Sequence, residues 1–543
     1  MRRLLFAGAV VTMLASVPSS ADARSFSYGV SSAEVTSSSA LLWARPPKSG
    51  RVRLVVARNK KFTRSVSTAL TAKKSNDLTV QGRVSHLTPG KRYYYFFTQG
   101  RQRSVIGTFA TAPKSTSART IRFAVTGDAD GVRANGSNYW NKDGSADWAT
   151  YKLMTREKND FNINLGDTIY SDAETEHGFP LALSLDQKRQ KYRLGLTYPN
   201  LERLRESGPV YNQWDDHEFV DDFNRHSEAC DVGSIFNNSY SCNIPSIWSA
   251  GVKAFREYMP VTYSAKNGTY RSFRWGKNLQ IFILDERSFR SLRASEVKQD
   301  PNAPEPTGHV CDNGGNDDVA PRVPQRIRDV FALVYPALAN PISPACLAAL
   351  NDPNRTMLGS RQYATFTKAI KASTARWKVI INEVPMMEFG INPYDDWEGY
   401  EAEREKLLTF LKDSVKNVAV VTTDFHTNWV NDARIKTYPE DGGPLPSGVK
   451  EFVAGGVADQ LFGHEIDGVT GQDGSWKLVD GVFLNRQPPD GPGMECSNMV
   501  TFGYAQLQAS ASSLKVVLKD NSGKQMSNAA DGKRCGPWVL KAR

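Results

Sequence analysis

"PVYNQWDDHEFVDDF", residues 209 to 223, places a short apolar run directly before a group of carboxylates. The run PVYNQW is typical of a buried strand, because it is brief and contains Val, Tyr and Trp. Carboxylates this close repel one another, and bringing two together raises one pKa strongly unless a cation lies between them. The stretch therefore predicts a strand that ends at a cation. The carboxylates that surround His217 are Asp215, Asp216, Glu218, Asp221 and Asp222.

The same arrangement follows five other apolar runs between residues 121 and 423. Helical stretches such as 147–158 and 401–415 separate these runs, which predicts a layered α/β or α+β domain over residues 121–543. In open α/β sheets ligands bind beyond the carboxyl ends of the strands, so we expect the residues that follow the runs to converge. These residues are Asp128 after 121–126, Asp167 and Tyr170 after 160–165, Asp285 to Arg287 after 279–284, Glu383 after 377–382, and Asp424 and His426 after 418–423.

The residue types at these strand ends predict a metal site. A single Gly-Asp pair is typical of a turn or a helix cap, but the repetition at six strand ends favours shared function. Carboxylates suit Ca²⁺, Mg²⁺ or Mn²⁺, and added imidazole and phenol groups would also accept Fe or Zn. Two cations about 3.5–4 Å apart activate a water and clamp both oxygens of a displacement, so the pattern predicts metal-assisted hydrolysis. His217 is the candidate proton donor to the leaving group.

The beginning of the chain follows a different pattern. Residues 1–23 have a basic start, an apolar run and a small-residue end, which predicts a signal peptide, of the Sec or the Tat type, and export to the periplasm or the outside. Residues 26–113 form short alternating runs separated by turn residues, which predicts an all-β sandwich of the immunoglobulin or fibronectin kind. Residues 114–120 are the expected linker. A stretch rich in Pro, Asn, Gly and Asp at about 299–356 is the expected insertion.

Cysteines and charge narrow the class of protein further. Six cysteines form three local couples, which favours disulfides in an exported chain although fifteen pairings are possible. The formal charge is +11, yet no block of basic residues interleaved with aromatic ones predicts a nucleic-acid surface. No apolar run is long enough to predict a transmembrane segment. The sequence leaves the oligomeric state open. The couples are Cys230 with Cys242, Cys311 with Cys346, and Cys496 with Cys535.

In this order, the motifs GDAD, LGDTIY, WDDHE, LDERSFR, MLGSRQ, WKVIINEVP, DDWEGYEAER and TTDFHTNW resemble the PhoD-like alkaline phosphatase family of the metallophosphoesterase superfamily. The stretch YGVSSAEVTSSSALLWARP is similar to the N-terminal β domain of that family. The resemblance covers residues 28 to 510 or so, and GDTIY joined to WDDHE is its most specific part. It implies a four-layer α/β/β/α phosphoesterase domain with two or more metal ions.

The resemblance also implies individual roles. Asp167 would bridge the metals, Tyr170 would bind one as a phenolate, and His217 would contact the phosphoryl group. Asp128 would be the first metal ligand. The family commonly carries a cysteine in this opening motif, so the identity of the metal ions is left undecided. Glu383 falls near a further ligand position that Asn382 could equally occupy. The remaining implied ligands are Asp216, Asp424 and His426.

The predicted activity is that of an exported, metal-dependent phosphoesterase acting on phosphate monoesters or diesters. Arg287, Arg290 and Tyr400 are candidate substrate contacts, because a guanidinium fork matches phosphate oxygens. Arg404 is expected on a solvated helix face. A phosphodiesterase of the phospholipase D type, acting on lipids or envelope polymers, is the first alternative. A metal-free glycoside hydrolase with two carboxylates and a noncatalytic, calcium-stabilised envelope-binding protein are the alternatives from other classes.

Overall fold

The structure, a computed structural model, describes most of the chain after residue 25. The predicted signal peptide (1–23), Cys230, Cys242 and much of the predicted insertion at 299–356 lie outside the described residues. Among the described residues no helix is long and apolar enough to cross a membrane. The described ranges are 26–130, 148–172, 181–227, 243–298, 310–311, 323–333, 336–390 and 394–543.

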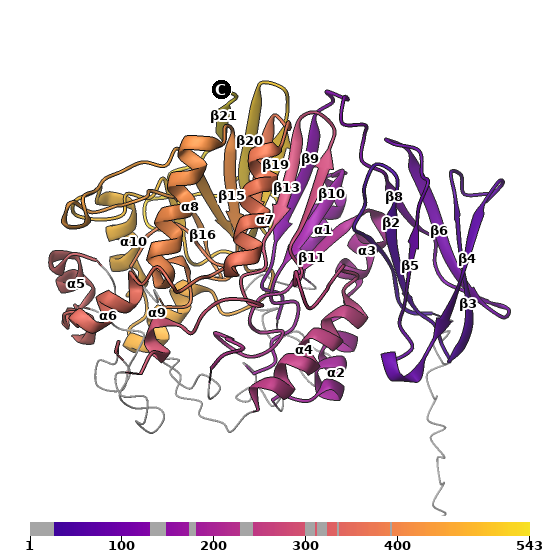
Figure 1. The fold of residues 1–543 in the computed structure, drawn as a ribbon, viewed down its shortest axis with the longest axis horizontal. Coiled ribbons are helices and arrows are strands. Elements are labelled where there is room, and N and C mark those ends of the chain that lie inside the picture. Colours follow the sequence, from indigo (N-terminus) through magenta and orange to yellow (C-terminus); the bar gives the residue numbers. More distant parts are fainter. Residues whose placement is uncertain are drawn as a thin grey trace, which may run out of the picture.

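The N-terminal region consists of two antiparallel sheets, drawn in indigo in Figure 1. Along β3 the side chains of Val52, Leu54 and Val56 are buried, whereas Arg51 and Arg53 point outward and are exposed. This period of two is the alternation that the sequence predicted. The strands are β1 (Ser27–Ala33), β2 (Ala40–Arg45) and β5 (Val80–Val84) in one sheet, and β4 (Val66–Ala72), β3 (Gly50–Ala57), β6 (Arg92–Gln99), β7 (Gln102–Arg103) and β8 (Gly107–Ala110) in the other.

The rest of the chain contains two larger sheets, and all six predicted strands are present in them. The first sheet has three parallel strands at one side and antiparallel strands at the other. Its order is β11 (Val210–Gln213), β10 (Phe161–Leu165), β9 (Ile121–Thr126), β19 (Gly503–Ala509), β20 (Ser513–Asp520) and β21 (Trp538–Lys541).

The second sheet has seven strands, four of which are parallel neighbours: β13, β14, β15 and β17. These strands are buried along most of their length, as parallel strands covered on both faces are. The order is β12 (Arg271–Trp275), β13 (Leu279–Ile283), β14 (Trp377–Ile381), β15 (Val418–Thr422), β17 (Lys450–Ala454), β16 (Asn428–Asp432) and β18 (Cys496–Asn498).

The two larger sheets share one buried core. Phe123 and Ile163 of the first sheet and Val379 and Val421 of the second belong to a single cluster of buried side chains. Helices supply separate clusters on the outer faces, as Figure 1 shows for α7 and α8. The helices are α1 (Ala149–Arg156), α2 (Leu185–Gly195), α3 (Pro199–Ser207), α4 (Ile244–Tyr258), α5 (Gln325–Phe331), α6 (Pro344–Leu350), α7 (Gly359–Ala372), α8 (Glu401–Ser414), α9 (Phe462–Thr470) and α10 (Trp476–Asn485).

The N-terminal region packs directly against the elements that lead to the acidic strand ends. The Trp43 indole donates a hydrogen bond to the Glu257 carbonyl at 2.7 Å, and the Tyr211 hydroxyl donates to the Val35 carbonyl at 2.5 Å. Tyr211 lies in β11, the strand that precedes Asp215 and Asp216. The two parts therefore form one continuous packed unit.

Two of the three predicted disulfides are confirmed. Cys311 bonds Cys346, and Cys496 bonds Cys535. The second bond ties β18, at the edge of the seven-stranded sheet, to the chain just before β21 of the other sheet. It therefore links the two sheets covalently near the C-terminus.

Glu257 and Arg189 form a buried ion pair between α2 and α4. Both carboxylate oxygens accept from the guanidinium at 2.7 Å, and that guanidinium also donates to the Ser75 carbonyl of the N-terminal region at 2.8 Å. We expect Glu257→Ala to lower the free energy of unfolding by about 3 kcal/mol, because it leaves the Arg189 guanidinium with only the exposed Asp186 as an ionic partner. Urea denaturation measures this loss. The double variant Arg189→Met/Glu257→Leu should recover more than half of it, and a loss below about 1 kcal/mol in Glu257→Ala would contradict the prediction.

Candidate metal centre

The ends of β9, β10, β11 and β15 bring distant acidic residues together. Among the described residues, four groups of three side chains bring one ligand atom per residue within 4.8 Å of the others. One group, Asp216 with Asp221 and Asp222, is less buried, and the other three join the predicted strand-end residues. Asp167 belongs to two of these three groups, and so does Asp216. The three groups therefore form one continuous cluster, in which two carboxylates connect neighbouring positions. The groups are Asp128 with Asp167 and His426, Asp167 with Asp216 and His217, and Asp215 with Asp216 and Asp424.

The backbone at these strand ends is in an unusual conformation. Asp128, Asp167, Asp424 and His426 have φ values of 54°, 46°, 76° and 46°. A left-handed conformation at a residue other than glycine costs about 1–3 kcal/mol and is concentrated at functional sites. The surrounding packing therefore holds four of the predicted ligands in a conformation that their own preferences oppose.

The carboxylate of Asp128 is held by backbone groups from two loops. It accepts hydrogen bonds from the Gly456 amide at 2.9 Å and from the Asp424 amide at 3.3 Å. Gly455 lies so close that a Cβ atom there would sit 2.1 Å from Asp128 Oδ2. The glycines after β17 are thus required for the close approach of this loop to the site.

Burial and mutual repulsion make it unfavourable for all carboxylates of the cluster to be ionised at once. Burial raises the pKa of Asp128 to about 6 and that of Asp215 to about 8. Burial, together with the charges of Asp215 and Asp216, raises the pKa of Asp424 well above its ordinary value, and burial with the charge of Asp216 does the same for Asp167. The acids need a positive partner to be ionised together at neutral pH.

Arg287 supplies part of that positive charge from within the chain. Its side chain is fully buried, its Nε donates to Asp215 at 2.5 Å, and its Nη1 donates to both oxygens of Asp395 at 2.7 and 2.9 Å. Its Nη2 lies 3.5 Å from Asp216 and from Asp424. One guanidinium therefore sits among four carboxylates. Asp395 was not predicted from the sequence, because it does not follow a strand.

The substrate contacts predicted for Arg290 and Tyr400 stay untested. The Arg290 guanidinium is fully buried and bonds the carbonyl and the carboxylate of Asp395. The Tyr400 hydroxyl donates to the Ser291 carbonyl at 2.8 Å. Both polar groups already have internal partners.

His217 lies between two loops that carry acids. Its Nδ1 is 2.7 Å from Asp172 and its Nε2 is 3.5 Å from Asp221, while its backbone amide donates to Asp167 at 3.3 Å. Burial lowers the pKa of His217, but the charges of Asp172, Asp216 and Asp167 outweigh it and hold the pKa well above its ordinary value. The imidazole is thus able to carry a proton. Asp172 was missed in the sequence, although it stands only two residues after Tyr170.

His426 and Tyr170 meet on the other side of the cluster. The phenol oxygen lies 2.9 Å from His426 Nε2, and the Tyr170 ring packs against the His217 ring with centroids 4.2 Å apart. Asp459 Oδ2 is also 2.9 Å from His426 Nε2. Asp459 follows β17 by five residues, so the strand-end pattern could have identified it.

The metal-binding role of Glu383 stays a prediction, whereas the expected position of Arg404 is contradicted. Glu383 is in none of the compact ligand groups, and its carboxylate accepts from the Glu286 amide at 2.5 Å and from the Gln213 amide side chain. It links the ends of β11, β13 and β14. The prediction of a solvated face for Arg404 was wrong: the side chain is fully buried, and its Nε donates to the Met386 carbonyl at 2.6 Å. Its helix is covered on this face by the loop after β14.

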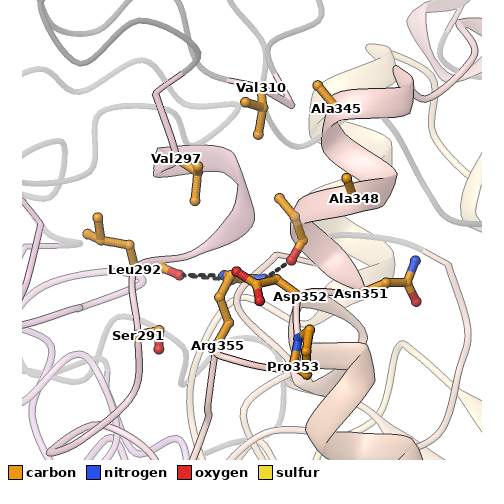
Figure 2. Close-up of a pocket in the computed structure, with 11 residues that line it drawn as sticks. Ser291, Leu292, Val297, Val310, Ala345, Ala348, Asn351, Asp352, Pro353 and Arg355 are labelled. Atoms are coloured by element: carbon orange, nitrogen blue, oxygen red, sulfur yellow. Dashed lines mark hydrogen bonds between the residues drawn. The ribbon is translucent and has the colours of Figure 1, made fainter.

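A separate cavity of about 700 Å³ lies beside α6 and contains none of the predicted site residues. Figure 2 shows its mostly apolar lining and Arg355 in its wall, hydrogen-bonded to the Leu292 and Ala349 carbonyls. The Arg355 guanidinium is thus hydrogen-bonded to backbone carbonyls and stabilises the wall of this cavity.

The donor set of the acidic cluster fits hard cations. Asp215 Oδ2 and Asp216 Oδ1 are buried oxygens that accept no hydrogen bond from the described residues. Buried acceptors without a partner are unfavourable, and a cation would satisfy both. The residues that would hold the ions are then Asp128, Asp167, Asp215, Asp216 and Asp424 with His426.

The fold is shared with two solved structures. A solved structure titled "Structure of PhoD" superposes with a TM-score of 0.68 and 20% identity, covering 94% of each chain. The purple acid phosphatase PPD1 from yellow lupin (Lupinus luteus) seeds has a TM-score of 0.55 and 12% identity, covering 93% of this chain and 73% of its own.

The sequence profile of the PhoD-like phosphatases matches residues 132–518, and that of the PhoD-like phosphatase N-terminal domain matches residues 12–113. The chain therefore belongs to the PhoD-like phosphatase family, as the motifs predicted. Alkaline phosphatase D of Bacillus subtilis (strain 168) is 25% identical over 456 residues, which cover 76% of this chain but 66% of that protein.

The raised carboxyl pKa values predict how the metal-free protein responds to pH. The pKa of Asp128 rises from 3.8 to about 6 and that of Asp215 from 3.8 to about 8 on folding. Their protonation stabilises the folded state fully below about pH 4, and this contribution is lost as pH rises through 6 and then 8. We therefore expect chelator-treated protein to melt about 5 °C lower at pH 8.5 than at pH 6.

Added Ca²⁺ or Mn²⁺ should raise the melting temperature more at pH 8.5 than at pH 6, because the cation replaces the protons. The Asp128→Asn/Asp215→Asn variant is the control and should show a smaller difference between the two pH values. Scanning calorimetry gives both quantities. Equal melting temperatures at the two pH values in the chelated wild-type protein would contradict this account.

Proposed function

We propose that this protein is a metal-dependent phosphoesterase whose cations are held at the strand ends. The observation that carries the proposal is the sharing of Asp167 and Asp216 between neighbouring ligand groups. A shared carboxylate places two cation positions side by side, and in-line displacement at phosphorus uses such a pair. Membership of the PhoD-like phosphatase family supports the same activity.

The two ends of the cluster differ in their donor atoms. Asp128, Asp167 and His426, with the phenol of Tyr170 nearby, make a mixed oxygen and nitrogen group that suits Fe or Zn. Asp215, Asp216 and Asp424 make an all-oxygen group that suits Ca²⁺, Mg²⁺ or Mn²⁺. When bound, such cations supply an activated water and neutralise charge on the phosphoryl oxygens. The carboxylate of Asp128 makes the first group harder than a cysteine would.

His217 is the proposed proton donor to the leaving-group oxygen. The Asp172 carboxylate, 2.7 Å from Nδ1, orients the ring and stabilises its protonated form, while Nε2, 3.5 Å from Asp221, is the nitrogen left to act on a substrate. A protonated imidazole at that position donates to the alkoxide as the bond to phosphorus breaks. Neighbouring Tyr170 restricts the ring by packing against it.

Arg287 has a proposed double role. It lies within 3.5 Å of Asp216 and Asp424, so it positions two proposed ligands. Its charge also adds to the field that a phosphoryl group would meet at this end of the cluster. Arg290 and Tyr400 are proposed to act indirectly. Arg290 contacts Asp395, which pairs with Arg287, and Tyr400 contacts Ser291 in the loop of Arg287.

We also propose the layer arrangement of the large domain, the sandwich form of the N-terminal region and export of the protein. The shared core between the two larger sheets and the separate helix clusters outside them support a four-layer α/β/β/α arrangement. The paired antiparallel sheets of residues 26–113 support a sandwich of the immunoglobulin or fibronectin kind. The two disulfides support export, because such bonds persist in oxidising compartments.

Turnover of a chromogenic phosphate monoester and a bis-ester, with elemental analysis of the same preparation, tests the activity. We expect two or more equivalents of metal and turnover of at least one substrate, both abolished by a chelator and restored by added ions. Bound metal without turnover of either ester would contradict the phosphoesterase proposal and favour a noncatalytic role. The ratio of the two rates separates a phosphatase from a diesterase.

Removing His217 should separate chemistry from metal binding. We expect His217→Ala to keep its metal content and to lose turnover by about 10²–10⁴-fold, because only proton transfer is removed. Asp167→Asn should lose metal and turnover together. His464→Ala, which removes an exposed histidine of α9, is the matched control and should leave both unchanged. Normal turnover in His217→Ala would exclude its proposed role.

A further inference from the structure

The positive charge of the protein is concentrated in its N-terminal region. Residues 26–113 contain 15 lysine and arginine residues against two acidic ones, a formal charge of +13. Residues 114–543 contain 50 basic and 54 acidic residues, a formal charge of −4. The sequence total of +11 conceals this division, so the electrostatic field of the molecule is strongly asymmetric.

Both acidic residues of this region face the rest of the chain. Glu34 is buried, 2.8 Å from Arg271 of β12. Asp77 bonds Arg45 and also Arg193 of α2 at 2.7 Å. The outer face of the β4-β3-β6-β7 sheet therefore carries no carboxylate to offset its basic side chains, and Figure 1 places β3 and β4 at the edge of the molecule farthest from α7 and α8.

Basic side chains are spread over this outer face and the loop at one end of it. Arg51 and Arg53 point outward from β3, and Arg58 and Lys61 follow it, all exposed. Arg58 follows Arg51 by seven residues, which at about 3.4 Å per residue of extended chain is a span of about 24 Å. A charge array of this width on a sheet surface matches a planar array of anionic groups rather than one bound ion.

Exposed apolar side chains flank the same end of the sheet. Val66 pairs with Val56, Val56 with Tyr95, and Tyr95 with Gly107, so one row crosses the sheet from β4 to β8. Val66 at one edge of this row is 54% exposed, and Ile106, beside Gly107 at the other, is 39% exposed. Val66 shares the face of buried Val56 and Tyr95, opposite to Arg51 and Arg53, so the attraction of the outer face to an anionic bilayer rests on its charge.

The aromatic rings of this face do not favour a nucleic acid. The Arg103 guanidinium lies 3.7 Å from the centre of the Phe96 ring, and the Phe62 ring packs edge-on against Phe96 with centroids 4.5 Å apart. A base needs a free ring face on which to stack. Here a cation covers that face and presents charge instead.

We propose that the outer face of the β4-β3-β6-β7 sheet, with the loop 58–65, docks the protein on an anionic lipid bilayer. The attraction is electrostatic and is screened by salt. The negative charge of residues 114–543 is repelled by the same surface, so the protein is held with its N-terminal region toward the lipid and its metal centre away from it.

Vesicle sedimentation of the full chain tests the proposal without requiring turnover. We expect binding to vesicles of 70% phosphatidylcholine and 30% phosphatidylglycerol at low salt, weak binding to pure phosphatidylcholine, and loss of the difference in 0.5 M NaCl. The quadruple variant Arg51→Gln/Arg53→Gln/Arg58→Gln/Lys61→Gln should reduce the partition coefficient for the anionic vesicles at least tenfold.

Lys368→Gln/Lys371→Gln/Lys412→Gln/Lys416→Gln is the matched control, because it removes the same charge from exposed positions on and beside α7 and α8. It should change the partition coefficient less than twofold. The predicted signal segment is present in every variant, so its own lipid affinity cancels. Equal losses in both variants, or no preference for anionic vesicles, would overturn the proposal. Binding of polyphosphate or single-stranded DNA without binding of vesicles would also overturn it. Unchanged melting curves establish that both variants are folded.

Discussion

Repulsion among buried carboxylates is the constraint on which the rest of this structure depends. Asp128, Asp167, Asp215, Asp216 and Asp424 lie in one cluster, and burial raises the pKa of four of them. Arg287 offsets part of the charge, and the proposed cations would offset the remainder. The same energetic conflict that makes the metal-free cluster unfavourable makes its affinity for cations high, because every ion that binds relieves it.

The scaffold holds this conflict in place by rigid packing. The ligands follow parallel strands whose outer and inner faces are both covered, and the strand ends adopt left-handed backbone that only such packing sustains. Carboxylates behind the cluster, such as Glu286 and Glu383, are bonded by each other's backbone amides and tie neighbouring strand ends together. These two glutamates thus fix the ends of β13 and β14 next to the acids of the cluster.

The N-terminal region contributes in two separate ways. Its inner side is fixed to α2, α4 and β11, so it supports the strand that carries Asp215 and Asp216. Its outer side bears the excess positive charge of the chain. The inner side of this region therefore supports the candidate site, and the outer side is the one that the proposed bilayer docking would use.

The sequence alone determined the strand order along the chain, the family and the residues at the strand ends, because these depend on local periodicity and on contiguous motifs. Asp128, Asp167, Asp216, Asp424, His217 and His426 were all identified in this way. The tertiary structure decided which of these residues share a site, that Arg287 is buried among them, and that the Glu383 carboxylate accepts from the Glu286 amide and the Gln213 side chain. It also revealed Asp172, Asp395 and Asp459, whose importance comes only from through-space contacts. The sequence periodicity determines which face of a strand or helix a side chain occupies. The distances between charged groups, in contrast, are set by how the sheets pack together.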